Sequence, residues 1–338
     1  MTDNIAISVV IPVYNVEKYL RKCLNSVCIQ GDCVKEIILI NDGSTDGSLA
    51  VCEEYAEKDS RIRIINQENK GLSATVRVGI RAAACEYIGF VDSDDYIEPD
   101  MYTLMAENMK KYDADVVWCE YDKVNEDGKR LNEELENEGE INVYDKENGR
   151  FSIVVYLLPF APVKSITGSR CNKLVKKDLL INNIAFEDFG INVGEDLALI
   201  TPVMFTANRI VHINKFLYHY LQRSTSIVHV YNRSSFVDYV KIMNIIKRAS
   251  EKYNYDIDFE DFAIRILYSN CINKIRISHL GFKERKAELK YIGENAQVRD
   301  LLKRKKIGGD FRFKVVMNLL KKKLYGLLAL IINKGVKK

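Results

Sequence analysis

Residues 5–41 read IAISVVIPVYNVEKYLRKCLNSVCIQGDCVKEIILIN, and this stretch decides the fold. It begins and ends with short runs rich in Ile and Val, which are typical of buried strands. Between these runs, residues 16–27 carry apolar side chains at helical spacing. The stretch therefore predicts a strand, a helix and a second strand that is parallel to the first.

The same alternation continues to about residue 121. Apolar runs at 61–66, 86–92 and 114–121 predict further strands, and the segments between them have the period of amphipathic helices. This order predicts an α/β fold with a mostly parallel, doubly wound sheet. In such sheets ligands bind beyond the carboxyl ends of the strands, so functional residues are expected directly after strands.

Beyond this region the pattern changes twice. Residues 122–149 are polar and predict a hairpin or an excursion from the sheet. A mixed segment follows from about 150 to 225, with a helix near 195–207 and two short strands, RIVHI and KFLYHYL. From about residue 232 onward the pattern is helical.

The composition is that of an ordinary globular protein. The 338 residues are 47% hydrophobic and 29% charged, which excludes disordered and collagen-like classes, and the net charge of +3 gives no reason to expect a nucleic-acid partner. The eight cysteines form no C-x-x-C pair, and the first residues lack a signal-peptide pattern, so we expect a cytoplasmic protein with reduced thiols. No apolar run reaches the ~18 to 20 residues that a membrane-spanning helix needs.

The C-terminal stretch, FKVVMNLLKKKLYGLLALIINKGVKK, combines aliphatic residues with lysine clusters. About a dozen Lys and Arg follow residue 300, and Asp310 is the single acid among them. Two interpretations stay open: an amphipathic helix on an anionic membrane surface, or a packed terminal helix with a solvated lysine face.

The stretch FVDSDDYIEPD, residues 90–100, crowds acidic side chains directly after an apolar run. Like charges this close raise one another's pKa unless a cation lies between them. On an extended backbone Asp92 and Asp94 project to the same side, where they suit Mg²⁺ or Mn²⁺ together with substrate phosphates. A solvated acidic turn before the next helix explains Glu98 and Asp100 well, but it explains the first two acids poorly.

Three other segments also stand at the ends of predicted elements. PVYN (12–15) and NDGSTDGS (41–48) follow the first two strands, and an Asp-Gly-Ser-Thr run is a tight turn that caps the next helix. A carboxylate in that position can also accept a hydrogen bond from a nucleobase N–H. Glu195 and Asp196 begin a predicted helix, where acids stabilise the N-terminus by about 0.3 to 1 kcal/mol. Alternatively, Asp196 is a general base, which its helix-end position keeps ionised and therefore weak.

Taken in order, these segments resemble the family 2 glycosyltransferases, inverting enzymes with the GT-A fold that build bacterial capsular and exopolysaccharides. The resemblance is carried over about residues 5–225 by ISVVIPVYNVEKYLRKCLNSV, EIILINDGSTDGS, NKGLSA, GFVDSDDYIEPDMY, CNKLVKKDLL and GEDLAL. It implies a GT-A nucleotide-diphospho-sugar transferase domain at 1–225, with a nucleotide-sugar-binding half at 1–121 and an acceptor half at 122–225. Residues 226–338 are then a helical extension with a basic amphipathic tail.

The resemblance also implies roles for individual residues. Asp42 matches the acid that contacts uracil, Asp94 the ligand of Mn²⁺ or Mg²⁺, and Asp196 the catalytic base, while Asp92 binds the metal through water or contacts a sugar hydroxyl. The residues implied to bind the nucleotide sugar are Pro12, Tyr14, Asn15, Asp42, Arg77, Asp92, Ser93, Asp94, Arg223 and Ser226.

Two stretches match the family pattern less well or less specifically than the others. GLSATVRVGI has Val76 where the family has Arg and Arg77 where it has Asn; because successive helical residues lie about 100° apart, Arg77 does not simply replace the missing Arg. YHYLQRSTSI resembles a family stretch in which Arg223, Ser226 and His219 would close over the diphosphate, although a strand-end charge and a buried histidine explain any one of them better.

The implied function is that of a hexosyl- or N-acetylhexosaminyltransferase. It uses a nucleotide-sugar donor and a polysaccharide or lipid-linked oligosaccharide acceptor, forms a β-linkage, and works as a peripheral protein on the inner face of the cell membrane. The alternative is a catalytically impaired homologue that acts as a scaffold for another transferase, which Val76 favours and the retained acids oppose. No G-x-G-x-x-G follows the first strand, which argues against a dehydrogenase, and no Gly-rich basic loop does, which argues against a nucleotidyltransferase.

Overall fold

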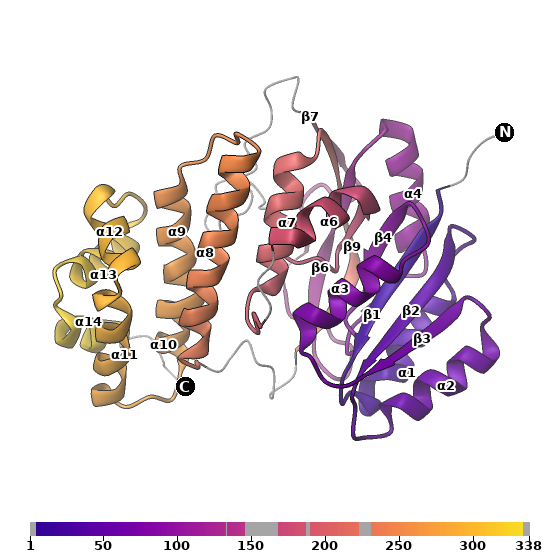
Figure 1. The fold of residues 1–338 in the computed structure, drawn as a ribbon, viewed down its shortest axis with the longest axis horizontal. Coiled ribbons are helices and arrows are strands. Elements are labelled where there is room, and N and C mark those ends of the chain that lie inside the picture. Colours follow the sequence, from indigo (N-terminus) through magenta and orange to yellow (C-terminus); the bar gives the residue numbers. More distant parts are fainter. Residues whose placement is uncertain (1–4, 133, 146–167, 187–189, 223–230, 334–338) are drawn as a thin grey trace. The chain divides into compact units, whose positions relative to one another are not determined.

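A mixed nine-stranded sheet organises the first two thirds of the chain (Figure 1). The computed structural model describes residues 5–132, 134–145, 168–186, 190–222 and 231–333. The strand order is β3-β2-β1-β4-β8-β6-β9-β5, with β7 paired to β9. The strands are β1 (Ile7–Val13), β2 (Val34–Asp42), β3 (Ile62–Gln67), β4 (Tyr87–Phe90), β5 (Tyr96–Ile97), β6 (Val116–Val124), β7 (Ile141–Asp145), β8 (Lys173–Lys176) and β9 (Arg209–Leu221).

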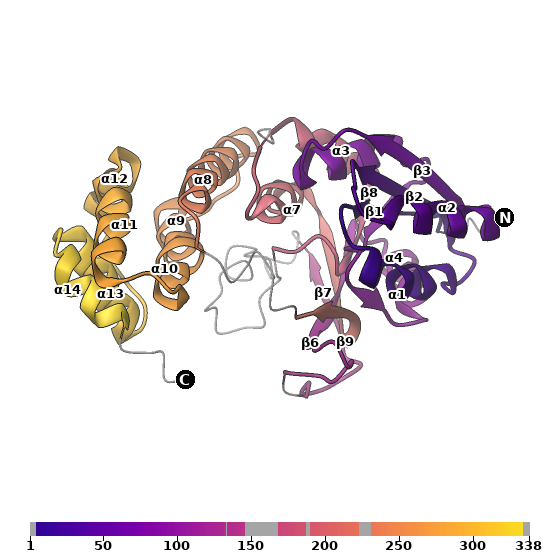
Figure 2. The same ribbon diagram turned by 90° about the horizontal axis from the view of Figure 1, so that it is seen from below.

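The first half of this sheet has the predicted doubly wound architecture. Strands β3, β2, β1 and β4 are all parallel, and β1 is buried along its whole length, as its Ile- and Val-rich sequence predicts. Their connections are α1 (Glu17–Cys28), α2 (Ser48–Lys58) and α3 (Leu72–Ala82), and α4 (Met101–Tyr112) follows β5. Figure 2 shows α3 on one face of the sheet and α1 with α4 on the other. The predicted α/β fold is therefore confirmed.

The second half of the sheet adds antiparallel strands. β8 lies between β4 and β6 and is antiparallel to both, whereas β6 and β9 are parallel to each other. Within the polar region predicted as an excursion, β6 continues to Val124 and β7 pairs with β9. Helices α6 (Lys177–Asn183) and α7 (Glu195–Thr206) and the short 3₁₀ helix η1 (Ile184–Phe186) precede β9.

The prediction of two short strands near 209–221 is wrong, because β9 is one strand of 13 residues. The polar Asn214 looks like a break between two apolar runs. In the structure its side-chain amide donates to the carbonyl oxygens of Glu136 and Asn137, at 2.7 and 2.6 Å. The polar residue thus has partners from another part of the chain and stays inside the strand.

The C-terminal region is helical, as predicted. Its elements are α8 (Ser234–Lys252), α9 (Phe259–Leu267), a π-helical turn η3 (Tyr268–Ile272), α10 (Asn273–Ile277), α11 (Phe282–Glu294), α12 (Ala296–Arg304), α13 (Phe311–Lys321) and α14 (Tyr325–Asn333). The tail is two helices, because Lys323 adopts a left-handed conformation (φ 61°) between α13 and α14. Phe313, Met317 and Leu328 are buried, which supports the packed-helix interpretation for one face of the tail.

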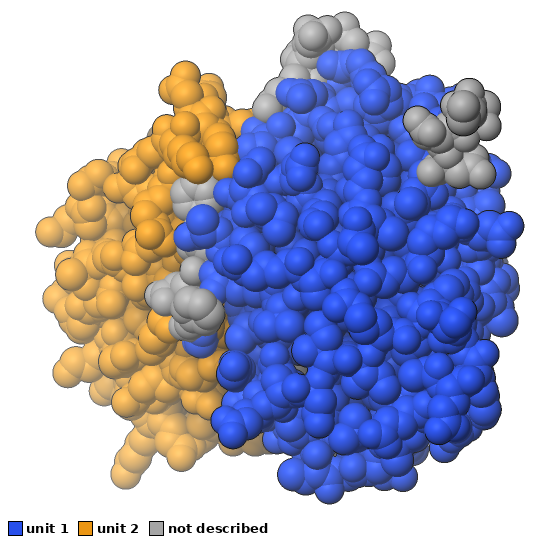
Figure 3. All heavy atoms as spheres, turned by 45° about the vertical axis from the view of Figure 1, so that its right-hand side comes forward, with its two compact units in different colours: residues 1–152, 168–190, 195–224 blue, residues 153–167, 191–194, 225–338 orange. Residues whose placement is uncertain are grey.

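The chain divides into two compact units (Figure 3). The first comprises residues 1–152, 168–190 and 195–224, and the second comprises 153–167, 191–194 and 225–338. Among the described residues, no helix is both long and apolar enough to cross a membrane.

Candidate active site

The loops after β1 and β2 contact each other through Asn15. Its side-chain oxygen accepts a hydrogen bond from the Thr45 N–H at 2.8 Å, and its own N–H donates to Ser44 Oγ at 3.2 Å. Tyr14 is 49% exposed beside it, whereas Pro12 is a buried residue inside β1 and not in the loop, since the strand continues to residue 13. The two segments predicted to bind the nucleotide are therefore neighbours.

Asp42 ends β2 as a buried carboxylate that organises the loop before α3. Its Oδ1 accepts from Gln67 Nε2 at 2.7 Å and from the Lys70 N–H at 2.9 Å, and its Oδ2 accepts from the Gly71 N–H at 2.9 Å. A carboxylate has about four acceptor sites. One more hydrogen bond can therefore be accommodated, and the contact with uracil stays a prediction.

Arg77 lies on α3 and is only 8% exposed. Its Nη2 donates to the carbonyl oxygen of Ile184 at 2.8 Å, and the neighbouring Val76 is buried as well. The structure thus gives Arg77 a partner in η1 that the sequence did not predict, because nothing in the pattern relates positions 107 residues apart. Its contact with a donor stays a prediction.

The acidic turn after β4 is anchored by Asp95, whose role the sequence left open. Asp95 is buried, and its carboxylate accepts from the Tyr218 hydroxyl at 2.6 Å and from the Leu221 N–H at 2.8 Å. The same hydroxyl accepts the Asp92 N–H at 3.1 Å. Burial raises the pKa of Asp95 well above its ordinary value, and the charges of Asp94 and Asp92 raise it further. Strand β9 therefore holds the turn in place.

Within the anchored turn, the two predicted metal ligands are accessible to different degrees. Ser93 between them is buried, whereas Asp92 and Asp94 are half-buried. The backbone here is not extended as expected, because Ser93 and Asp94 lie in a turn that the Asp95 N–H closes by donating to the Asp92 carbonyl oxygen at 2.9 Å. A shared side for Asp92 and Asp94 therefore stays a prediction.

A buried arginine, Arg170, joins this turn to the start of α7. It is 1% exposed; its Nη2 forms an ion pair with Asp92, and its Nη1 forms ion pairs with Asp196 and, at 3.2 Å, with Glu195. Burial by itself lowers the pKa of Arg170, but Asp196 and Asp92 raise it well above the ordinary value. No local pattern singles out this residue, which directly precedes the CNKLVKKDLL segment.

The candidate base, Asp196, lies in a more buried setting than its helix-end position suggests. Burial raises the pKa of Asp196, while the Arg170 guanidinium opposes the rise. Burial and the charge of Asp196 raise the pKa of the adjacent Glu195 to about 8. Burial therefore favours the protonated form of Asp196 and the guanidinium favours the ionised form, and the base strength expected at this position stays a prediction.

A second buried cation lies close by on β8. Lys173 Nζ donates to Asn172 Oδ1 at 2.8 Å and to the Ser169 carbonyl oxygen. Burial lowers the pKa of Lys173 to about 8, and the charge of Asp196 acts in the opposite direction. Arg170 is ion-paired with the candidate base, and the charge of Lys173 also acts on it.

His219 has a structural setting instead of the predicted place over the diphosphate. Its ring lies between Asp122 Oδ1, 2.6 Å from Nδ1, and Glu98 Oε1, 2.9 Å from Nε2, and it stacks on Tyr96 at 4.4 Å. Glu98 thus bonds to β9 and does not simply stabilise a helix start. Arg223 and Ser226 lie outside the described residues.

Asp92 and Asp94 are the half-buried carboxylates whose chemistry would suit a hard divalent cation. In the described part of the chain, no group of three or more His, Cys, Asp or Glu side chains is arranged to hold a metal. Mg²⁺ typically binds through one or two carboxylates, with substrate phosphates and waters as its other ligands. Asp94 and Asp92 provide such oxygens, and one guanidinium among Asp92, Glu195 and Asp196 leaves the group net negative.

Comparisons with known proteins identify the family and the fold. The model of "Glycosyl transferase family 2" matches residues 8–162. Glycosyltransferase GlyG of Streptococcus pneumoniae serotype 4 is 34% identical over 66% of this chain and 72% of its own length. Glycosyltransferase GlyA of the same organism is 36% identical over 67% of this chain, which spans only 32% of GlyA. TarS of Staphylococcus aureus, residues 1–349 in complex with UDP, shares the fold with a TM-score of 0.68 at 20% identity, over 97% of this chain and 90% of that one.

These likenesses define the class of protein, a glycosyltransferase enzyme with the GT-A fold. The chain belongs to glycosyl transferase family 2. The family, fold and enzyme class implied by the sequence motifs are thereby confirmed.

Proposed function

We propose that this enzyme moves a hexose or N-acetylhexosamine from a UDP-sugar to a hydroxyl group of a growing, lipid-linked surface polysaccharide, with inversion to a β-glycosidic bond. The observation that carries the proposal is the Arg170 ion-pair group, which joins the acidic turn to Asp196. A solved TarS structure in complex with UDP-GlcNAc supports a UDP-sugar as the donor here.

In the proposed reaction, Asp196 accepts the proton of the acceptor hydroxyl as its oxygen attacks the anomeric carbon. The new C–O bond forms on the face of the anomeric carbon opposite its bond to the diphosphate oxygen. That bond breaks, and its electron pair leaves with UDP. An α-linked donor therefore gives a β-linkage. Arg170 holds Asp196 and Asp92 on one guanidinium and thereby fixes the base relative to the donor side. Asp94, with Asp92 through water, would hold a Mn²⁺ or Mg²⁺ ion, which would supply positive charge for the departing diphosphate.

Two substitutions test this function. Asp94→Asn and Asp196→Asn are each expected to lower UDP release from a panel of UDP-sugars at least about 100-fold. General-base catalysis contributes roughly that much for Asp196, and Asp94 is the proposed direct ligand of the metal. Glu107→Gln, an exposed acid on α4, is the matched control and is expected to act like wild type. If both Asn variants complement a deletion strain as well as the wild type does, the chain is a scaffold and the proposal fails.

We further propose that the C-terminal tail holds the enzyme on the inner face of the cell membrane. Leu324, Leu327 and Leu330 are 45%, 48% and 55% exposed on and just before α14. They recur every three residues and follow the lysine run 321–323. Exposed aliphatic side chains next to lysines suit an anionic lipid surface.

A further inference from the structure

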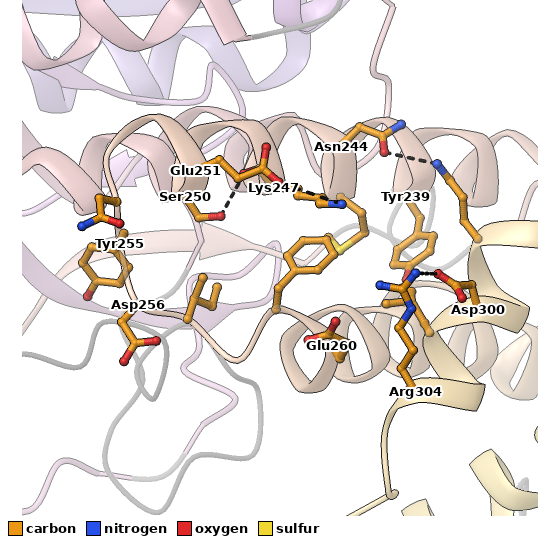
Figure 4. Close-up of a pocket in the computed structure, with 16 residues that line it drawn as sticks. Tyr239, Asn244, Lys247, Ser250, Glu251, Tyr255, Asp256, Glu260, Asp300 and Arg304 are labelled. Carbon is orange, nitrogen blue, oxygen red and sulfur yellow. Dashed lines mark hydrogen bonds and ion pairs between the residues drawn. The ribbon is translucent and has the colours of Figure 1, made fainter.

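A cavity of about 650 Å³ lies within the helical unit, between α8, α9 and α12 (Figure 4). Its volume is in the range of sites for small organic ligands, roughly 300 to 1,000 Å³. All of its lining residues fall between 239 and 304, outside the segments that carry the family motifs. It therefore shares no residue with the candidate active site in the chain's first unit.

The floor of the cavity is apolar and partly fixed. Tyr239 and Met243 on α8 are buried, and the Tyr239 hydroxyl donates to the carbonyl oxygen of Ala263 at 3.1 Å, which holds the ring in place. Tyr255 and Phe259 are half-buried and present ring surface to the cavity. Such a floor suits a ligand with apolar faces.

The rim of the cavity is polar and net negative. The charged lining residues are four acids and two cations: Glu251, Asp256, Glu260, Asp300, Lys247 and Arg304. Each cation pairs with an acid of its own helix, Lys247 with Glu251 at 3.9 Å and Arg304 with Asp300 at 2.8 Å. A phosphate or another anion would therefore meet excess negative charge, and both cations of the rim already pair with acids.

The amides on the rim add donors as well as acceptors. Asn244 on α8 accepts from Gln297 Nε2 on α12 at 3.3 Å, and both side chains are exposed. Each amide offers a carbonyl oxygen and two N–H groups, while carboxylates only accept hydrogen bonds. Hydroxyl groups, which both donate and accept, match this mixture of donors and acceptors, whereas a carboxylate or a phosphate does not.

We propose that this cavity binds a neutral, hydroxyl-rich glycan, a segment of the polysaccharide acceptor; this role rests on the proposed function. The acids and amides of the rim take the hydroxyl groups, and the aromatic floor takes the apolar faces of the sugar rings. The helical unit thereby gives the enzyme a second point of attachment to a long acceptor, and linked sites raise overall affinity without new contacts in the first site.

Binding of defined neutral tetrasaccharides to the full chain tests the inference. The probes are β-1,4-linked tetrasaccharides of glucose and of N-acetylglucosamine, measured by titration calorimetry and saturation-transfer NMR. At least one is expected to bind, and glucose 1-phosphate is expected not to compete. If neither tetrasaccharide binds, or if the sugar phosphate displaces it, the inference is overturned.

Two variants locate the binding. Asn244→Trp fills the cavity from an exposed helical position, and Glu260→Ala removes one rim acceptor. Asn244→Trp is expected to weaken tetrasaccharide binding at least about tenfold because the indole occupies the space of a sugar ring, and Glu260→Ala about tenfold because one charged hydrogen bond is lost. Glu107→Ala on α4 is the control and is expected to bind like wild type. Wild-type affinity in Asn244→Trp would place the glycan elsewhere and refute the site.

The donor-site variant separates this inference from the proposed function. Asp94→Asn is expected to abolish UDP release and to keep tetrasaccharide binding. If the wild-type protein binds the tetrasaccharide at this cavity but never releases UDP from any donor, the proposed function fails and the glycan site stands. If the wild-type protein releases UDP but binds no tetrasaccharide, the glycan site fails and the proposed function stands.

Discussion

Arg170 is the residue on which the geometry of the candidate site depends. Its replacement by Ala leaves Asp92, Glu195 and Asp196 close together without their counter-ion, and breaking a buried ion pair costs about 3 to 5 kcal/mol. We expect Arg170→Ala to lower the free energy of unfolding by about that amount and to abolish UDP release. Denaturant titration and the UDP-release assay measure the two effects.

A lysine at position 170 shows whether stability and activity require the planar guanidinium or only its positive charge. Arg170→Lys keeps the charge and loses the two-nitrogen geometry, so it is expected to recover part of the stability and little of the activity. Arg81→Ala, an exposed arginine on α3, is the matched control. Wild-type stability and activity in Arg170→Ala would show that the ion-pair group is not needed.

At the scale of residues, the sequence predicted that the acidic turn has a cationic partner, but it did not predict which residue is that partner. Acids crowded at 90–100 require a cation, and Asp92 and Asp196 could be selected from strand-end and helix-start positions. The cation itself could not be selected, since Arg170 is 78 and 26 residues away from these partners. Long-range packing, and no local pattern, decides which arginine is buried beside which acid.

At the scale of elements, Asp115 fixes the start of β6 to its neighbours. Its carboxylate accepts from Lys176 Nζ at 2.9 Å on β8 and from the Asn208 N–H at 2.7 Å just before β9. Burial by itself raises the pKa of Asp115, but these hydrogen bonds hold it below the ordinary value. Because the pKa of Asp115 is lower in the folded than in the unfolded protein, its ionised carboxylate stabilises the fold at pH values above the pKa of the unfolded state. This stabilisation disappears as the pH falls through the pKa of the folded state.

Asp115→Asn is therefore expected to lower the free energy of unfolding by about 1 to 2 kcal/mol at pH 7. The difference from wild type is expected to shrink below about pH 4, where the unfolded carboxyl becomes protonated. Denaturant titrations between pH 3 and pH 7 measure it. Asp113→Asn, two residues away and exposed, is the control, and a pH-independent difference would contradict the electrostatic explanation.

Periodicity predicted the elements well where partners are local. The strands and helices before residue 121 follow from alternating apolar runs, and the structure confirms them. The prediction failed at Asn214 and at Lys323, where the deciding facts are a distant backbone partner and a left-handed residue that is not glycine. A single sequence carries no local signal for either.

At the scale of the whole molecule, the two units differ in how far sequence could describe them. The motifs cover the sheet-containing unit, and the comparisons confirm its family. The helical unit has no motif, so its cavity becomes visible only when α8, α9 and α12 are packed together. A site made from side chains on three helices is a product of packing and not of spacing.

The tail leads to a prediction about the whole protein. Leu327→Glu with Leu330→Glu places negative charge on the exposed face of α14 and leaves the buried Leu328 untouched. We expect the wild-type protein to sediment with vesicles that contain phosphatidylglycerol and the double variant to lose at least about tenfold in binding, because each glutamate replaces a lipid-facing leucine. Co-sedimentation at low and physiological salt measures this.

Two comparisons distinguish the tail from non-specific attraction. Vesicles of phosphatidylcholine alone are expected to bind the wild type weakly, since the lysines 321–323 find no anionic lipid there. Leu131→Glu, an equally exposed leucine in the sheet-containing unit, is the matched control and is expected to bind like wild type. Equal sedimentation of the double variant and the control would remove α14 from the membrane contact and leave the tail as a packed pair of helices.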